Sequence, residues 1–124
     1  MIKILVAEDD RAINSLVSSV LVQHGYEAVS CFDGTQALEL AETQNFDMII
    51  TDIMMPGTDG FGLAEKIRER DSRIPILFMT ALDDKPSKQR GYRIGIDDYV
   101  VKPFDVDLLL LRVGALLRRA DIER

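Results

Sequence analysis

The sequence predicts an α/β fold in which helices cover both faces of a parallel sheet. Five short apolar runs recur at nearly regular spacing, and the segments between them are long enough for helices. Strands that are apolar throughout are typical of a parallel sheet buried on both faces. A length of 124 residues suits one domain with a single core. The predicted strands are KILVA (3–7), EAVSCF (27–32), FDMIIT (46–51), PILFMT (75–80) and DYVV (98–101).

The first three helices are predicted from capping residues and apolar periodicity. The first helix begins after Asp10, a good N-cap, and ends before Gly25. Two further helices are expected over residues 34–43 and 60–70. Each has an inward face of apolar side chains. The inward residues are Ile13, Leu16, Val17, Val20 and Leu21 in the first helix, Ala37, Leu38 and Ala41 in the second, and Phe61, Ala64 and Ile67 in the third.

The last two helices depart from a simple amphipathic pattern. The segment DDKPSKQRGYRIG contains one proline and two glycines and has almost no apolar stripe, so we expect a short, mobile helix there. The final helix is expected over 106–119, where Leu108 to Leu111 are consecutive. This apolar surface is wider than a covered core requires, so part of it is expected to meet a partner.

Composition excludes several classes of protein. The formal net charge of −6 argues against nucleic-acid binding by this domain, because a phosphate backbone attracts the opposite sign. The single cysteine, Cys31, lies in an apolar run and is predicted to be a buried thiol. No run is long enough to cross a bilayer, and the opening MIKILVAEDD has too short an apolar stretch for a signal peptide. We therefore expect a cytoplasmic location and no membrane contact.

Charged and hydroxyl side chains gather where the predicted strands end, the edge at which doubly wound sheets bind ligands. Crowded carboxylates repel one another unless some are protonated or a cation joins them. Oxygen ligands without histidine or cysteine suit a hard ion, Mg²⁺ before Zn²⁺. The group consists of Glu8, Asp9 and Asp10 after the first strand, Asp52 after the third, Thr80 in the fourth and Lys102 after the fifth.

Each member of this group has a simpler explanation when it is taken alone. Asp10 and Asp9 can be helix caps, Lys102 a solvated lysine and Thr80 an ordinary strand residue. Their coincidence at successive strand ends favours a functional site. With a bound cation, such a site suits phosphoryl chemistry, in which an aspartate is the nucleophile and a lysine holds a phosphate oxygen.

Four motifs in chain order, ILVAEDD, TDIMMPGTDG, ILFMTA and DDYVVKPF, resemble the receiver domain of bacterial two-component response regulators. The resemblance extends over essentially the whole chain. It implies a flavodoxin-like doubly wound (βα)5 three-layer sandwich, with five parallel strands in the order 2-1-3-4-5. It also implies a receiver domain over residues 1–119, with 120–124 beginning a linker toward a C-terminal DNA-binding domain.

The resemblance assigns a role to each acidic residue. Asp52 would accept a phosphoryl group from a sensor histidine kinase in a Mg²⁺-dependent reaction. Asp9 would bind Mg²⁺ directly, Glu8 would act through water, and Asp52 with the backbone carbonyl of Met54 would complete the metal site. The domain would then be a signalling switch that catalyses only its own phosphorylation and dephosphorylation, and not an enzyme with a separate substrate.

The same resemblance assigns the remaining polar residues. Thr80 would hydrogen-bond the bound phosphoryl group, and Lys102 would pair with its oxygens. Tyr99 matches the switch aromatic, which turns inward as Thr80 moves toward the phosphate; without the resemblance, a surface aromatic is the default expectation. The bond between Lys102 and Pro103 is expected to be cis.

The segment DYVVKPFDVDLLLLRVGALLRR is most similar to the OmpR/PhoB-type subfamily, whose receivers precede a winged-helix DNA-binding domain. In that subfamily phosphorylation favours a symmetric dimer through the fourth helix, fifth strand and fifth helix. Asp98 and Arg112 match one of its charged pairs. Lys88 matches a second, but its usual acidic partner position holds Leu108.

A third charged pair of this dimer also departs from the subfamily pattern. Arg93 stands at the usual acidic position and would face Arg119. These departures weaken the standard pairing and favour a more apolar dimer that uses Leu108 and Leu111. The alternative is that the charges form only a solvated face.

Met54 and Leu82 flank the phosphoryl site, and both are apolar. Neither can orient an attacking water, so we expect slow self-dephosphorylation.

Four alternative functions make different demands on these residues. A haloacid-dehalogenase-type phosphatase requires a second aspartate two residues after the first, where this chain has Met54. A flavin mononucleotide carrier requires a first loop rich in Ser, Thr and Gly, where this chain has Glu8, Asp9 and Asp10. The presence of Asp52, Thr80 and Lys102 argues against a pseudo-receiver that is not phosphorylated. A stand-alone single-domain regulator is the main alternative within the receiver class.

Overall fold

The structure, a computed structural model, describes residues 1–121 and has the predicted α/β architecture. All five strands are parallel and lie in the order β2-β1-β3-β4-β5, as the resemblance implied. Each element lies within two residues of its predicted bounds. The strands are β1 Lys3–Ala7, β2 Glu27–Cys31, β3 Met48–Thr51, β4 Ile76–Thr80 and β5 Asp98–Val101, and the helices are α1 Arg11–Gln23, α2 Gly34–Thr43, α3 Gly60–Arg70, α4 Lys85–Ile94 and α5 Val106–Arg119.

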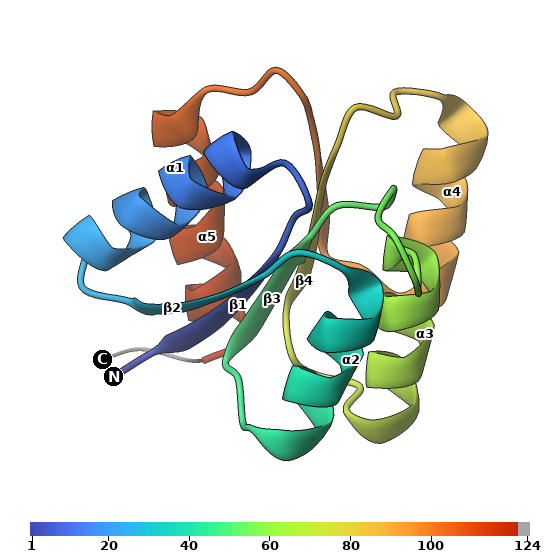
Figure 1. Cartoon of the computed structure of the whole chain (residues 1–124), viewed down its shortest axis with the longest axis horizontal. Coiled ribbons are helices and arrows are strands. Elements are labelled where there is room, and N and C mark those ends of the chain that lie inside the picture. The colour runs from blue at the N-terminus through green and yellow to red at the C-terminus, as the bar shows by residue number, and fades with distance from the viewer. Residues whose placement is uncertain (122–124) are drawn as a thin grey trace.

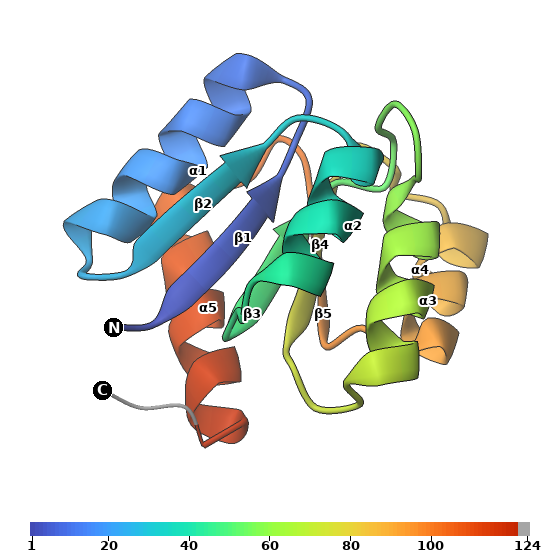
Figure 2. The same ribbon diagram turned by 60° about the horizontal axis from the view of Figure 1, so that its bottom comes forward.

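The sheet is the middle of three layers. Helices α1 and α5 cover one face, and α2, α3 and α4 cover the other (Figures 1 and 2). Successive side chains of a strand point to opposite faces of the sheet. In β4, Leu77 and Met79 therefore pack in the core under α1 and α5, and Phe78 packs in the core on the opposite face. All five residues of β4 are buried. A rigid, doubly covered sheet therefore carries the residues at its carboxyl edge.

Every helix begins with an aspartate cap. In each case the aspartate side chain accepts hydrogen bonds from backbone N–H groups of the first turn, which otherwise lack partners. This confirms the simpler explanation of Asp10, which is the cap of α1 as predicted. The five caps are Asp10, Asp33, Asp59, Asp84 and Asp105.

The inward face of α1 differs from its prediction. Leu16 was expected to be buried and is 48% exposed, while Asn14 is fully buried. The buried face runs through Asn14, Val17 and Leu21, a spacing of three and four residues. Leu16 therefore lies outside this face because the helix is rotated to bring a polar residue inward. The inward residues predicted for α3 are all buried.

Helix α4 is held by little burial, as its composition indicated. Gly91 is its one buried residue, and a side chain there would approach the Ile96 Cδ1 atom to 2.8 Å. The helix backbone thus lies close to the side chains of Ile96 and Phe78, which favours glycine at this position. The expected mobility of α4 remains a prediction.

Two further predictions concern the single cysteine and the absence of a membrane-spanning helix. Cys31 is buried, and burial raises the pKa of its thiol to about 12. Across residues 1–121, no helix combines the length and the hydropathy that a bilayer crossing requires. Residues 122–124 of the predicted linker start lie outside the described residues.

Candidate functional site

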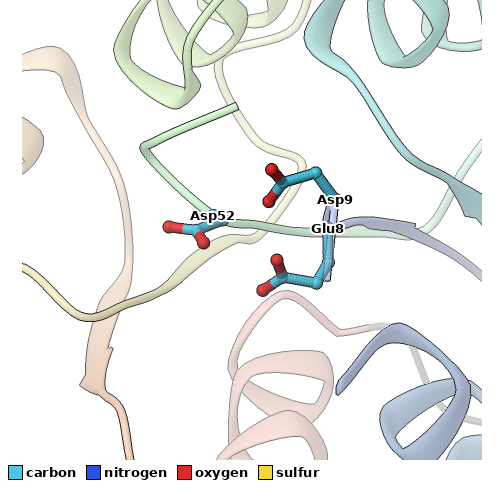
Figure 3. A group of neighbouring side chains, drawn as sticks. All are labelled: Glu8, Asp9 and Asp52. Carbon is cyan, nitrogen blue, oxygen red and sulfur yellow. The ribbon is translucent and has the colours of Figure 1, made fainter. Parts of the chain in front are cut away.

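Three carboxylates meet at the carboxyl edge of the sheet. Glu8 and Asp9 follow β1, and Asp52 follows β3 (Figure 3). Because Ala7 and Thr51 are partners in the parallel β1–β3 ladder, the residues after them leave the sheet side by side. One oxygen from each carboxylate lies within 4.8 Å of the other two. The structure thus brings together the acidic residues that the sequence placed at successive strand ends.

Asp52 is only 6% exposed, and protein donors occupy both of its oxygens. Its Oδ1 accepts hydrogen bonds from the backbone N–H groups of Ile53 at 2.6 Å and Met54 at 3.3 Å. Its Oδ2 accepts one from the Lys102 ammonium at 2.7 Å. Charge-assisted bonds of this kind offset the cost of burying a carboxylate.

Lys102 is shared between two acids. Its Nζ atom lies 2.5 Å from Glu8 Oε1 as an ion pair, in addition to its bond to Asp52. Burial lowers the pKa of Lys102, but the hydrogen bonds to Asp52 and Glu8 outweigh that effect and raise it above its usual value. The ammonium therefore stays charged at neutral pH. The Lys102–Pro103 bond that follows is cis, as predicted.

The cluster contains more acid than base. Burial raises the pKa of Glu8, and the nearby Asp52 charge adds to this, while Lys102 and the Asp10 N–H act in the opposite direction. Within the described residues, the one close partner of Glu8 Oε1 is the Lys102 ammonium. Three close carboxylates with a single ammonium among them form an oxygen-only donor set that fits a small divalent cation.

A short chain of hydrogen bonds joins Thr80 to Tyr99. The buried Thr80 hydroxyl accepts a bond from the Leu82 N–H at 3.3 Å, and the Tyr99 hydroxyl donates to the Leu82 carbonyl at 2.7 Å. The Tyr99 ring packs edge-on against Phe78, with 6.1 Å between centroids. Tyr99 is 9% exposed, so the default expectation of a surface aromatic is wrong.

Tyr99 is expected to make the fold sensitive to alkaline pH. Burial raises its pKa to about 12, against about 10 in an unfolded chain. Below pH 10 the phenol is protonated in both states. Between pH 10 and 12 the unfolded state ionises first, so Tyr99 lowers the free energy of unfolding by up to roughly 3 kcal/mol. Urea unfolding of the wild type and of Tyr99→Phe from pH 8 to 11 measures this effect. If the free energy of unfolding has the same pH dependence in both proteins, the prediction is contradicted.

Three charged residues predicted for a dimer face, Lys88, Asp98 and Arg112, already have partners within the chain. Arg112 donates to Asp98 Oδ1 at 2.8 Å, and Lys88 contacts Asp83 Oδ1 at 2.6 Å. The predicted charges are therefore satisfied without a second copy. Leu108 and Leu111, the apolar residues of the predicted face, are 49% and 69% exposed, respectively.

Asn14 is the residue near the site that the sequence did not single out. Its side chain contacts the backbone at the ends of β1 and β2, including the Glu8 carbonyl. The helical spacing of Asn14 with Val17 and Leu21 was a signal that it is buried. That spacing could have identified it if the search for an inward face had included polar residues.

Comparison with known families agrees with this geometry. Residues 4–114 match the model of the response regulator receiver domain. The chain belongs to this family. Its similarity to transcription regulators also matches the OmpR/PhoB type indicated by the last strand and helix.

Two curated relatives illustrate the similarity. The DNA-binding dual master transcriptional regulator RpaA of Synechocystis is 44% identical over 98% of this chain and 51% of its own length. The alkaline phosphatase synthesis transcriptional regulatory protein PhoP of Bacillus subtilis is 39% identical over 97% of this chain and 50% of its own length. The receiver chain thus spans about half the length of these relatives.

Solved receiver structures have the same fold. The Francisella response regulator 1452 receiver domain has a TM-score of 0.90 and 38% identity, covering 96% of this chain and 98% of its own. The response regulator TrrA from Thermotoga maritima, in complex with Mg²⁺-BeF, has a TM-score of 0.85 and 35% identity, covering 94% and 100%. Membership of the receiver family decides against the phosphatase and flavin-carrier alternatives.

Proposed function

We propose that Asp52 of this receiver accepts a phosphoryl group from a sensor histidine kinase and that the modified domain controls a transcriptional output. The observation that carries the proposal is the cluster of Asp52 with Glu8, Asp9 and Lys102 at the sheet edge. The similarity to transcription regulators of about twice this length supports an output domain after the receiver. A stand-alone receiver is the second possibility.

In the proposed reaction an Asp52 carboxylate oxygen attacks the phosphorus of a phosphohistidine. The P–O bond forms as the P–N bond breaks, and the imidazole nitrogen takes the electron pair. The other ring nitrogen of the phosphohistidine is protonated, so the histidine leaves as neutral imidazole and no further proton is required. Lys102 moves from its bond with Asp52 to a phosphoryl oxygen, where its positive charge offsets the negative charge that the phosphoryl group brings. Thr80 then donates its hydroxyl to another phosphoryl oxygen.

Glu8, Asp9, Asp52 and the Met54 carbonyl are proposed to hold Mg²⁺. The bound ion would neutralise phosphoryl oxygens and so lower the barrier to transfer. This ligand set is supported by the oxygen-only chemistry of the cluster and by its excess of carboxylates over the one ammonium, Lys102. No reaction beyond phosphorylation and dephosphorylation of this domain is proposed.

The proposed switch uses bonds described above. When the Thr80 hydroxyl turns to the phosphoryl group, it stops accepting from the Leu82 N–H. Because the Leu82 carbonyl also holds Tyr99, the change passes to β5 and α4. The few buried residues of α4 allow that helix to respond at low cost.

The test is the intact mass of the chain after incubation with acetyl phosphate, with Mg²⁺ and with a chelator instead. A gain of one phosphoryl group that requires Mg²⁺ is the expected result. A purified cognate kinase in its phosphorylated form should give the same product. No gain under any condition would identify the chain as a pseudo-receiver and reject the proposal.

The phosphoryl group on Asp52 is expected to be long-lived. Met54 is exposed beside the site, Leu82 is half-buried, and neither side chain can orient a water for attack. Replacing them together by Asn and Gln should shorten the half-life of the phosphorylated form about tenfold or more, because a polar group can then direct water. Mass spectrometry after removal of the phosphodonor measures this half-life. An unchanged half-life would reject the explanation, and Leu108→Asn is a matched control.

A second copy of the chain is the proposed partner of α4, β5 and α5 after phosphorylation. Leu108 and Leu111 offer an exposed apolar centre for it. Opening the Asp98–Arg112 pair would supply charges at its rim. Light scattering of the phosphorylated chain tests this, and a monomer at all concentrations would reject it.

We further propose that the domain itself binds neither nucleic acid nor membrane and works in the cytoplasm.

A further inference from the structure

Asn14 is a polar residue on an otherwise apolar buried face. Its side chain is fully enclosed between α1 and the sheet, beside Val17 and Leu21. A buried amide is tolerated only where its donors and acceptor find partners. Asn14 has them on both sides: its Nδ2 donates to the Cys31 carbonyl at 2.9 Å, and its Oδ1 accepts from the Ser18 hydroxyl at 3.1 Å.

The second bond of the Asn14 Nδ2 reaches the acidic turn. Nδ2 donates to the Glu8 carbonyl at 3.0 Å and lies 3.5 Å from the Val6 carbonyl. Glu8 follows the last residue of β1, but its N–H still donates to the Cys31 carbonyl at 3.1 Å. The N–H side of Glu8 is therefore fixed by β2, and its carbonyl side by Asn14. The first bond holds the peptide that precedes Glu8, and the bond from Asn14 holds the plane of the peptide that links Glu8 to Asp9.

The orientation of this peptide sets where two of the three carboxylates point. The Glu8 and Asp9 side chains leave the backbone on either side of it, and both must turn toward Asp52 for their oxygens to lie within 4.8 Å. Figure 3 shows the two side chains leaving the same turn, beside Asp52. Rotation of the peptide would move both carboxylates at once, although neither of them contacts Asn14.

We propose that Asn14 is a positioning residue for the cation site: it binds the Glu8 carbonyl and so holds Glu8 and Asp9 in the arrangement that a divalent ion requires. The inference rests on the proposed function, since it assumes that these acids bind Mg²⁺. Asn14 acts through the backbone and does not touch the ion. Partners that orient metal ligands in this way commonly change affinity about 10- to 100-fold when they are removed.

Two substitutions test the donors of Asn14. Asn14→Leu has a similar size and suits the apolar surroundings, whereas Asn14→Asp keeps the shape and an acceptor but loses both N–H donors. Titration of each ¹⁵N-labelled protein with MgCl₂ gives the dissociation constant from backbone amide shifts, and the same spectra show whether the variant is folded. Both variants are expected to bind Mg²⁺ about tenfold more weakly than the wild type.

Two controls separate positioning from stability. Ser18→Ala removes the partner of the Asn14 oxygen and leaves both N–H bonds to the backbone. Leu117→Ala opens a cavity in the core against α5, remote from the acidic turn. Both controls are expected to retain the wild-type dissociation constant within about twofold, although Leu117→Ala lowers the melting temperature.

The outcomes are distinct. Equal affinity in the wild type and in folded Asn14 variants overturns this inference and leaves the proposed function in place. Absence of any Mg²⁺-dependent shift in the wild type removes the proposed metal site, and the inference with it. If neither variant folds, the side-chain amide signal of wild-type Asn14 decides: it should shift on Mg²⁺ binding together with the Glu8 and Asp9 amides, and a stationary signal overturns the inference.

Discussion

Asp52→Asn is expected to abolish the Mg²⁺-dependent gain of a phosphoryl group, with less than about 1% of the wild-type rate remaining. The amide has nearly the shape of the carboxylate, so its oxygen can still accept from the Ile53 and Met54 N–H groups. It is neutral, however, and a poor nucleophile toward phosphorus. Its NH₂ group would also face the Lys102 ammonium, where Oδ2 now accepts a hydrogen bond. Intact mass after incubation with acetyl phosphate measures the effect.

Asp10→Asn is the matched control for this substitution. Asp10 lies one residue after the acidic pair, and its side chain accepts from the Ala12 and Ile13 N–H groups as the cap of α1. Asparagine caps helices about as well as aspartate, so fold and phosphorylation should both persist. A phosphoryl gain that survives in Asp52→Asn and disappears in Asp10→Asn would place the acceptor elsewhere.

Most of the fold could be predicted because the local signals and the packing agree. The strands are largely apolar, each of the five helices begins directly after an aspartate cap, and α1 and α4 end within two residues of a glycine. The site could be predicted for the same reason. Its members follow successive strands, and a parallel sheet with register Ala7 to Thr51 necessarily brings their side chains together.

The features that local sequence patterns do not reveal depend on contacts between distant segments. The inward rotation of Asn14 depends on backbone carbonyls of β1 and β2, which no apolar periodicity reports. The direction of Tyr99 depends on the Leu82 carbonyl and the Phe78 ring, so only the family resemblance pointed inward. In both cases a polar group on one element satisfies the backbone of another.

Gly34 belongs to the same class, and its sequence context alone marks it only as a helix start. Its N–H donates to the Pro56 carbonyl at 3.0 Å, so α2 begins in direct contact with the loop that follows Asp52. A Cβ atom at this position would lie only 1.4 Å from the Thr58 carbonyl oxygen and 2.4 Å from the carbonyl carbon. Both obstacles are backbone atoms, which cannot move aside as a flexible side chain can.

Gly34→Ala is therefore expected to lower the free energy of unfolding by about 3 kcal/mol, at the upper end of overpacking effects. For a domain of this size, that corresponds to a melting temperature lower by roughly 10 °C. The loop that follows Asp52 must move away from α2, so the proposed binding of Mg²⁺ through the Met54 carbonyl should weaken in the protein that remains folded. Thermal unfolding followed by circular dichroism measures the first effect, and an amide-shift titration measures the second.

Gly114→Ala makes the same chemical change where space is available. Gly114 lies within α5, and its nearest neighbour is the end of the flexible Arg118 side chain at 3.3 Å. Because alanine is the better helix former, this variant should gain up to about 1 kcal/mol of stability. The two substitutions should thus change the melting temperature in opposite directions. If the melting temperature of Gly34→Ala is as high as that of Gly114→Ala, the contact between α2 and the loop that follows Asp52 does not constrain the site.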